Sequence, residues 1–479
     1  MIEDEWKFYN KNGNIIYISI LYNMDIYLKT KLSTVSEYLL NQITTKPGNN
    51  KNFSRRIYNQ IIKLSSNKQK IEIIEKKLKG AIFKGKLLPN ANFIKCDLRN
   101  SIFNESILTG AIFEDSNLSR SFFIKSILIG AYFGNLSLAK SFFVGANLTS
   151  ATLRYLNFRD ADLSYSILHN TTLVATDFVN AKFIGADLRV VDLSEIDFEN
   201  ADLSNAKLDG NKKLSGTKFV RTKFTSASLR ETDFKLSILF RADFEFCNLV
   251  ETHLKFVDLR HANLKNCKLN HVNFKGSNLS YTDFTNSDLR FAYFDQTILD
   301  GAIFKKTDLS GATFLRNNLD NGIRYNVILP KVDFSECSLH DVSFEGSVFT
   351  NCTFIRTKIV NTFFKNSIIR HCDFTRANFT RAEFRNSILK DINFTNANMH
   401  MSMFRQLDMI DINFKGAIFH KVEFLDVKFD GSIINSSDNK NRIFLGKKME
   451  PIQLIQHNDS IIKGFRISNA NGKGNANGN

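Results

Sequence analysis

Proline and tryptophan are scarce in this sequence, which has four prolines and one tryptophan among 479 residues. Proline removes a backbone N–H donor, so its scarcity indicates a backbone in which nearly every N–H group is hydrogen-bonded. Catalytic sequence motifs are missing as well. The chain contains no C-x-x-C, G-x-S-x-G or H-E-x-x-H motif and no phosphate-binding or dinucleotide-binding glycine pattern. We therefore expect neither an enzyme nor a bound cofactor.

A long hydrophobic run is also absent. The most apolar early stretch, residues 15–22, is too short to span a bilayer, and Asn23 and Asp25 follow it. The acidic and polar start, MIEDEWKFYN, predicts no signal peptide, and no lipidation motif stands out. We expect a soluble protein of a reducing, cytoplasmic compartment. Secretion as an effector without a cleavable signal is the alternative.

Positive charge is in excess, but it is concentrated at the two ends of the chain. The formal net charge is +16. Residues 1–80 hold 14 basic and 7 acidic residues, and residues 435–479 hold 7 and 3. The 43 basic and 38 acidic residues of the middle, 81–434, nearly balance. The middle of the chain is therefore close to neutral.

Phenylalanine is abundant, and it recurs in steps of five. From Phe83 to Leu208 every fifth residue is Leu or Phe, which gives 26 positions. One extra residue falls within 209–213, a stretch of turn-type composition. The series resumes at Leu214 and gives 45 more positions up to Ile434, of which only Arg324 is not Leu, Phe, Ile or Met. Phe occupies 34 of these 71 positions, which explains most of the 45 phenylalanines.

The repeated unit is A-(D/N)-(L/F)-x-x, with a small or β-branched residue two positions before the large one. A period of five suits neither common element. It advances about 140° beyond a full helical turn, and in a flat strand it alternates between the two faces. The chain must therefore turn once in each repeat. The small and the large residue then point inward, and the other residues turn the corner and face water.

This pattern resembles the pentapeptide-repeat family over residues 81–434. The resemblance implies an all-β solenoid, a right-handed quadrilateral β-helix with four repeats and 20 residues per coil, and hence about 18 coils. Phe and Leu alternate over long stretches, so Phe recurs every ten residues. On a four-sided coil this places Phe on two opposite walls.

All six cysteines occupy the small position, which predicts inert packing thiols in place of Ala. Cys247 should stack on Cys267, and Cys352 on Cys372, because each pair lies 20 residues apart. His400 and His420 should stack on the surface about 5 Å apart. No third ligand accompanies them, so no metal site is expected.

The pattern fails in one internal place and at both ends. At 321–326, the sequence NGIRYN predicts a bulge in which Ile323 fills the lumen and Arg324 points outward, because a buried unpaired guanidinium is too costly. Residues 1–80 lack the repeat. Residues 54–79 predict an amphipathic helix that begins near Ser54 and ends at Gly80, in a region that serves as a cap or as a targeting module. Residues 435–450 should cover the other end, and the Asn/Gly-rich tail, 469–479, should be disordered.

With the repeat explaining most of the sequence, a long rigid surface for binding a protein partner is the leading functional hypothesis. Its best feature is a basic band in residues 356–405, where nine cations face three acidic residues. Spacings of 20 predict one column of Lys365, Arg385 and Arg405 and another of Arg356 and Arg376. These five residues are the candidate partner-binding residues. An acidic protein or a phosphate-bearing surface would suit them.

Three further possibilities stay open. Some members of the family imitate duplex DNA and act on type II topoisomerases, but that function needs a negative rod. The basic ends and band could instead bind nucleic acid or an anionic surface. The Phe-rich final coils, residues 374–429, could form a homodimer interface, or the C-terminal segment could cover them.

Overall fold

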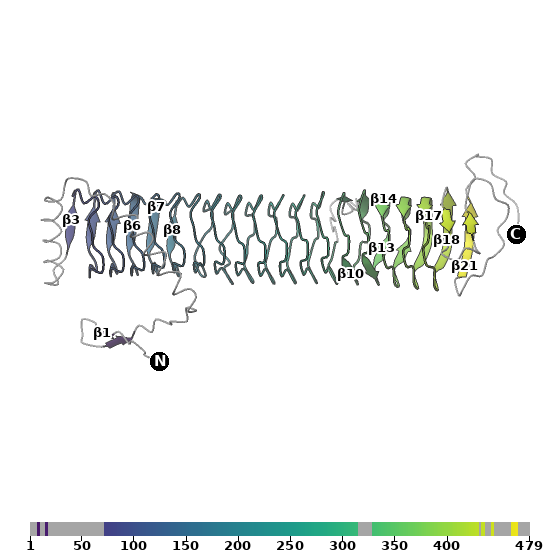
Figure 1. Ribbon diagram of the computed structural model, residues 1–479, viewed down its shortest axis with the longest axis horizontal. Coiled ribbons are helices and arrows are strands. Elements are labelled where there is room, and N and C mark those ends of the chain that lie inside the picture. Colours follow the sequence, from purple (N-terminus) through teal and green to yellow (C-terminus); the bar gives the residue numbers. More distant parts are fainter. Residues whose placement is uncertain are drawn as a thin grey trace, which may run out of the picture. The chain divides into compact units, whose positions relative to one another are not determined.

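The computed structural model describes residues 71–314 and 328–430 together with five short strands outside them. These are β1 (Lys7–Tyr9), β2 (Ile15–Tyr17), β19 (Ile433–Asn435), β20 (Arg442–Phe444) and β21 (Ile461–Ile467). The chain divides into two compact units, residues 1–59 and 60–479. In the first unit β1 and β2 pair antiparallel. The second unit is a parallel β-solenoid (Figure 1).

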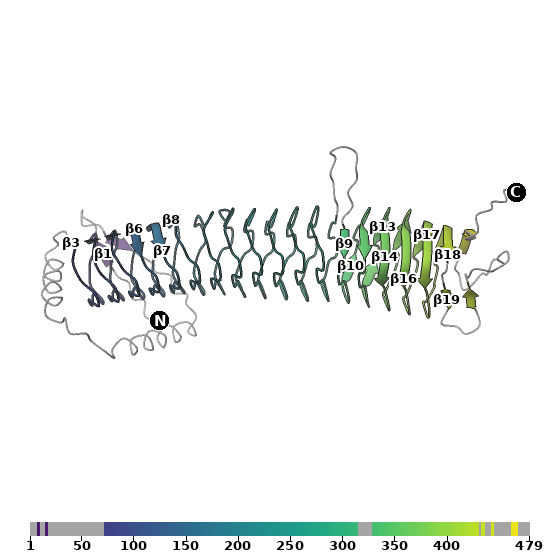
Figure 2. The ribbon, with the colours of Figure 1, turned by 90° about the horizontal axis from the view of Figure 1, so that it is seen from above.

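Short strands form the walls of the solenoid at its two ends, and Figure 2 shows its coils stacked in one row. Between Asp177 and Thr313, neighbouring coils are joined by isolated parallel bridges instead of named strands. The strands are β3 (Glu72–Ile74), β4 (Asn92–Ile94), β5 (Ile112–Glu114), β6 (Tyr132–Ser137), β7 (Thr152–Asn157), β8 (Thr172–Val174), β9 (Ile328–Pro330), β10 (Ser338–His340), β11 (Val348–Thr350), β12 (Lys358–Val360), β13 (Phe363–Lys365), β14 (Ile368–Asp373), β15 (Glu383–Arg385), β16 (Ile388–Asn393), β17 (Met403–Asn413) and β18 (Glu423–Asp430).

Pairing between residues 20 apart sets the register, as in Phe93 with Phe113 of β4 and β5. Each coil therefore contains four repeats, and we name its sides A, B, C and D after the large inward residues of the first coil, Ile73, Leu78, Phe83 and Leu88. The solenoid has about 17 turns. The predicted all-β solenoid with four repeats per coil is thus confirmed.

The lumen is filled by the large residues, which we call core residues. Phe93 and Phe113 of side A stack with ring centroids 4.9 Å apart and planes 3° apart. Phe93 meets Phe103 of the opposite side C edge to face, at 5.6 Å and 86°. Both geometries are favourable for aromatic rings. Phe therefore lies on two opposite walls in these coils, as the period of ten predicted.

The small inward position, two residues before each core residue, is where buried hydroxyl and thiol groups find partners. Thr222 Oγ1 donates a hydrogen bond to the backbone oxygen of Phe198 in the preceding coil, at 2.8 Å. The Cys247 thiol makes the same contact with Phe224 at 2.8 Å, and Cys267 with Phe244 at 3.0 Å. All six cysteines are free and buried. The prediction that they replace small core residues is confirmed.

The corners between sides have the same backbone geometry from coil to coil. The residue two positions after each core residue adopts a positive φ in nearly every described repeat, and even the β-branched Val190 has φ 60°. The Asp or Asn before the core residue stabilises the turn, since its side-chain oxygen accepts a hydrogen bond from the N–H two residues later. Ser164 donates to Asp162 in this way at 3.0 Å. The repeated Asp and Asn therefore have a structural role.

The solenoid begins earlier than the repeat predicted. Ile73 of β3 pairs with Phe93, and Ile71, Ile73 and Leu78 are buried, so the first coil starts before residue 81. The helix predicted for 54–79 is therefore wrong for residues 71–79, and the rest of it lies outside the described residues. Ile71, Ile74 and Leu78 fit a helical period, which explains the error, although Ile74 is exposed in the solenoid.

Two places change the register. Near the predicted extra residue, Phe198 donates to the backbone oxygen of Lys218 instead of to a residue 19 positions later, so that coil has 21 residues. Asn211 fills the small position there, and its Nδ2 donates to the backbone oxygens of Leu188 and Val191 at 3.0 and 2.9 Å.

The second change is larger. Thr313 pairs with Ser343, and Ile303 with Asp333, which are steps of 30 residues. Phe314 of side A is therefore followed on side B by Leu329, where one five-residue step would have reached 319. The stretch from Phe314 to Leu329 is therefore ten residues longer than one five-residue step. The prediction for Ile323 and Arg324 lies outside the described residues.

At the far end, β21 pairs in parallel with β18, and Phe424 lies opposite Ile462. β19 and β20 pair antiparallel. The C-terminal segment of the chain itself therefore occupies the edge of the Phe-rich final coils, which is the second of the two arrangements considered from the sequence.

Two corner glycines provide a matched test of how rings cover the corners. Gly301 (φ +66°) lies beneath the Tyr281 ring, 2.6 Å from where a Cβ would stand, whereas Gly130 (φ +64°) has nothing within 4 Å. Both Ala variants should lose about 1 kcal/mol to the backbone. Gly301→Ala should lose roughly 1–3 kcal/mol more from overpacking, measured by urea unfolding. Adding Tyr281→Ala to Gly301→Ala should remove that additional loss of stability. Equal losses in the two single glycine variants would contradict the packing argument.

The thiols should be unreactive in the folded protein. Burial raises the pKa of Cys267 to about 12, and burial also raises the pKa values of Cys96, Cys247 and Cys337. Because the thiolate is the reactive form, a disulfide reagent at about pH 8 should react with all six thiols only after denaturation. One equivalent of prompt reaction in the native protein would contradict this burial.

Candidate functional site

A column of charged side chains lies on the outer surface of side A, one residue after the core residue. β13, β15 and β17 pair in parallel, and their register places Lys365 next to Arg385 and Arg385 next to Arg405. Glu345 occupies the equivalent position one coil before Lys365. The column predicted from the 20-residue spacing is therefore present. We call Lys365, Arg385 and Arg405 the cation column.

The cation column borders a groove of about 230 Å³. The groove forms because the residues before and after each core residue project from side A as two parallel ridges. Its lining consists of Ser343, Glu345, Phe363, Lys365, Glu383 and Arg385. The Phe363 ring is 46% exposed, although it points away from the core. The groove thus combines an exposed ring with two cations and two carboxylates.

The charges of the column are not equally available. Lys365 Nζ lies 3.1 Å from Glu345 Oε1, and Arg405 Nη2 lies 2.9 Å from Glu423 Oε2. The hydrogen bond that Arg405 donates to Glu423 raises the pKa of Arg405, whose Nε is buried without a hydrogen-bond partner. Among residues 71–314 and 328–430, no ion pair to Arg385 is found. Arg385 is therefore the cation of the column that is most available to a ligand.

The other two predicted residues lie elsewhere on the coil. Arg356 and Arg376 occupy the corner after side C, with φ 57° and 58°. Side C is opposite side A, because two of the four repeats separate them. The five predicted residues therefore form two separate columns and not one patch. Neither Arg356 nor Arg376 has an ion pair among the described residues.

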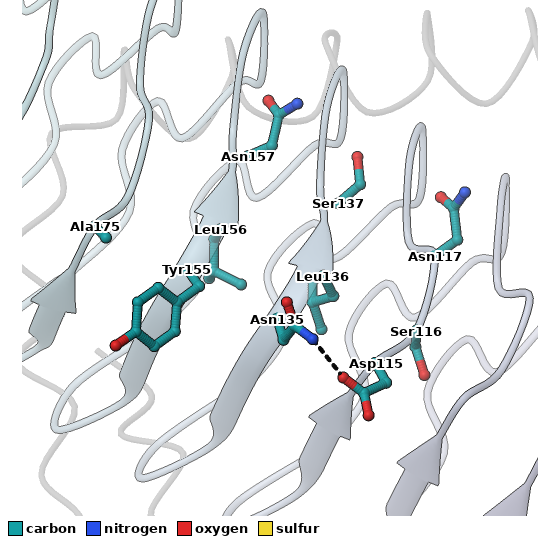
Figure 3. Close-up of a pocket in the computed structure, with 10 residues that line it drawn as sticks. All are labelled: Asp115, Ser116, Asn117, Asn135, Leu136, Ser137, Tyr155, Leu156, Asn157 and Ala175. Carbon is teal, nitrogen blue, oxygen red and sulfur yellow. Dashed lines mark hydrogen bonds between the residues drawn. The ribbon is translucent and has the colours of Figure 1, made fainter.

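A second groove, shallow, open to solvent and of about 570 Å³, was not predicted. It follows the corner between sides A and B over four coils, and Figure 3 shows Leu136 and Leu156 between two rows of mainly polar residues. We call it the corner groove. Its lining consists of Asp115, Ser116, Asn117, Asn135, Leu136, Ser137, Tyr155, Leu156, Asn157 and Ala175. The sequence signal was Leu at positions 136 and 156, where the repeat requires a small residue.

The remaining polar clusters offer little chemistry. His400 and His420 stack at 4.9 Å, as expected from their spacing. In the described part of the chain, no group of three or more His, Cys, Asp or Glu side chains is arranged to hold a metal ion. That part also contains no helix with the length and apolar character needed to cross a membrane.

Comparison with known families agrees with the five-residue register. A model of pentapeptide repeats matches residues 87–123, 126–164, 157–194 and 181–210, and a model of the pentapeptide repeat region matches residues 237–314. Residues 315–394 match a model of the SV2A/B/C luminal domain. A search of curated proteins found no match.

Several solved structures are similar to parts of the chain. HetL, a pentapeptide repeat protein involved in heterocyst differentiation regulation in the cyanobacterium Nostoc sp. strain PCC 7120, is 26% identical. That match covers 45% of this chain and 88% of HetL, with a TM-score of 0.21. Full-length QnrB1, a plasmid-mediated fluoroquinolone resistance protein, is 15% identical over 55% of this chain and 91% of its own, with a TM-score of 0.14.

A third match is AT2G44920, a pentapeptide repeat protein of the Arabidopsis thaliana thylakoid lumen. It is 25% identical over 25% of this chain and 69% of its own, with a TM-score of 0.12. The matched models and the pairing of residues 20 apart lead to the same assignment: this chain belongs to the pentapeptide-repeat family.

Proposed function

We propose that this protein is a non-catalytic interaction protein whose solenoid binds an acidic segment of a partner protein along the cation column. The availability of Arg385 is the observation that carries the proposal. Arg385 lines a groove that also contains an exposed Phe ring and two carboxylates, and it has no ion pair within the described residues. Acidic side chains of a partner would therefore find a cation whose charge is not yet neutralised.

The spacing of the column suits an extended segment. Neighbouring coils of a parallel sheet are about 4.8 Å apart, so two steps from Lys365 to Arg405 span roughly 10 Å. In an extended polyproline II segment, which has three residues per turn and rises about 3.1 Å per residue, residues i and i+3 share one face about 9 Å apart. Phe363 can pack against an apolar residue between two acidic ones. A segment with acidic residues at that spacing and an apolar residue between them fits the groove.

A catalytic function finds little support in the described residues. All six thiols are buried, and burial raises the pKa values of Cys96, Cys247, Cys267 and Cys337, so the thiols are poor candidates for a nucleophile. Most Asp and Asn side chains before the core residues accept backbone hydrogen bonds at the corners, which commits them to structure. Most exposed carboxylates that pair do so with Arg or Lys on the same wall, as Asp97 does with Arg99 at 2.7 Å.

The DNA-mimic alternative is weakened by the charge of the solenoid. Residues 71–314 hold 31 basic and 27 acidic residues, and residues 328–430 hold 13 and 12. Duplex DNA carries one negative charge per about 1.7 Å of axis, which a near-neutral rod does not reproduce. The anionic-surface alternative shares the cations of the proposed site, and it differs by the ligand that would bind.

Charge reversal tests the proposal. Binding of a fluorescent peptide with Glu at every third position should weaken about five-fold in Arg385→Glu, because the available cation becomes a carboxylate, and should change less than two-fold in Arg376→Glu. Both arginines lack an ion pair among the described residues, and they lie on opposite sides of the coil. Fluorescence anisotropy at two salt concentrations measures the affinities, which should fall as salt screens the charges.

Equal effects of the two reversals would show that net charge, and not the column, governs binding. Tighter binding to heparin or duplex DNA than to the peptide would favour the anionic-surface function. Inhibition of a type II topoisomerase by the full chain would favour the DNA mimic.

A further inference from the structure

The corner groove lies where two successive coils carry leucine in the small inward position. Leu136 and Leu156 are 7% and 2% exposed, so they occupy the small inward positions despite their size. At this corner β6 and β7 each run for six residues, and Leu136 pairs with Leu156 across them. Both strands therefore extend through the corner, with left-handed Asn135 and Tyr155 within them and the two leucines between two ridges.

One ridge of the groove presents amide donors. Asn117 and Asn157 each accept a backbone hydrogen bond through Oδ1, from the N–H of Ser119 and Arg159, both at 3.0 Å. These bonds fix the two amide groups. Their Nδ2 groups have no partner in the part of the chain that the structure describes. The ridge therefore holds two oriented donors two coils apart.

The opposite ridge presents acceptors and a ring. Asp115 Oδ1 accepts a hydrogen bond from Asn135 Nδ2 at 2.7 Å, which leaves Oδ2 available (Figure 3). Tyr155 follows one coil after Asn135 and is 62% exposed. Its hydroxyl has no partner among residues 71–314 and 328–430.

The ring of Tyr155 differs from most other rings at the left-handed corners. Tyr165, Phe256, Tyr281 and Phe291 each lie over a glycine of the next coil, at 2.5–2.7 Å from where its Cβ would stand. Tyr155 is instead followed by Ala175, which has φ 48° and also lines the groove. The Tyr155 ring is therefore not required to cover a glycine, and it borders open space.

We propose that the corner groove binds an oligosaccharide of uncharged sugars that lies along the solenoid axis. Asp115 is the one charged residue of the lining, so the groove does not suit a phosphate or an acidic segment. Fixed amide donors, a free carboxylate oxygen and an exposed tyrosine match the hydroxyl groups and the apolar C–H face of a sugar ring. From Asp115 to Ala175 the groove covers three steps, roughly 14 Å, and groups repeat at each coil as sugars do along a glycan.

This inference is independent of the cation column, since the two sites share no residue. Its test uses the full chain and four neutral hexasaccharides as probes: those of cellulose, chitin, starch and β-mannan. Isothermal titration should show saturable binding of at least one of them. Tyr155→Ala should weaken that binding at least ten-fold, because the ring provides the stacking face. Ala175→Arg should block it by filling the groove while leaving Tyr155 in place.

Tyr281→Ala is the matched control, because Tyr281 occupies an equivalent left-handed corner, is 49% exposed and lies outside the groove. It should bind the hexasaccharide as the parent protein does. Thermal melting of all three variants separates a lost site from a lost fold. Failure of all four probes to bind, or equal weakening by Tyr155→Ala and Tyr281→Ala, would overturn the assignment.

Discussion

Parallel pairing between residues 20 apart is the constraint on which the rest of this structure depends. The wall residues bond to the neighbouring coil at a fixed offset, so side chains stack on their own equivalents. That is why Phe meets Phe at 4.9 Å along side A, and why a hydroxyl or thiol in the small position meets a carbonyl of the preceding coil. A side chain that suits one coil must also suit its two neighbours.

The same constraint arranges the outer surface. A residue type repeated every 20 positions becomes a straight column, and the cation column and the corner groove are both products of this rule. Candidate binding sites are therefore found where the surface departs from the repeated pattern. Arg385 is notable because its neighbours in the column have ion pairs, and the corner groove lies where leucine takes the small position in two successive coils.

Most of the fold could be predicted from the sequence because the five-residue period reports directly which residues face inward. The cysteine positions, the His400–His420 stack and the Lys365–Arg385–Arg405 column followed from counting alone. The period could not locate the first coil, since Ile71, Ile74 and Leu78 also fit a helix. It could not show that Leu329 follows Phe314 in the coil, because an excess of ten residues keeps the same phase. It also could not reveal the corner groove or the ion pairs, which depend on side-chain geometry.

The two register changes differ in the structural compensation that they require. One added residue near Asn211 moves every later core residue by one place, and a buried amide with two carbonyl partners fills the resulting misfit. The excess between Phe314 and Leu329 equals two whole repeats, so the coils on either side need no compensating side chain. The position of a coil along the solenoid axis therefore depends on how many hydrogen-bonded coils precede it and not on how many residues do. The chain can be longer at that point while the four sides keep their alignment.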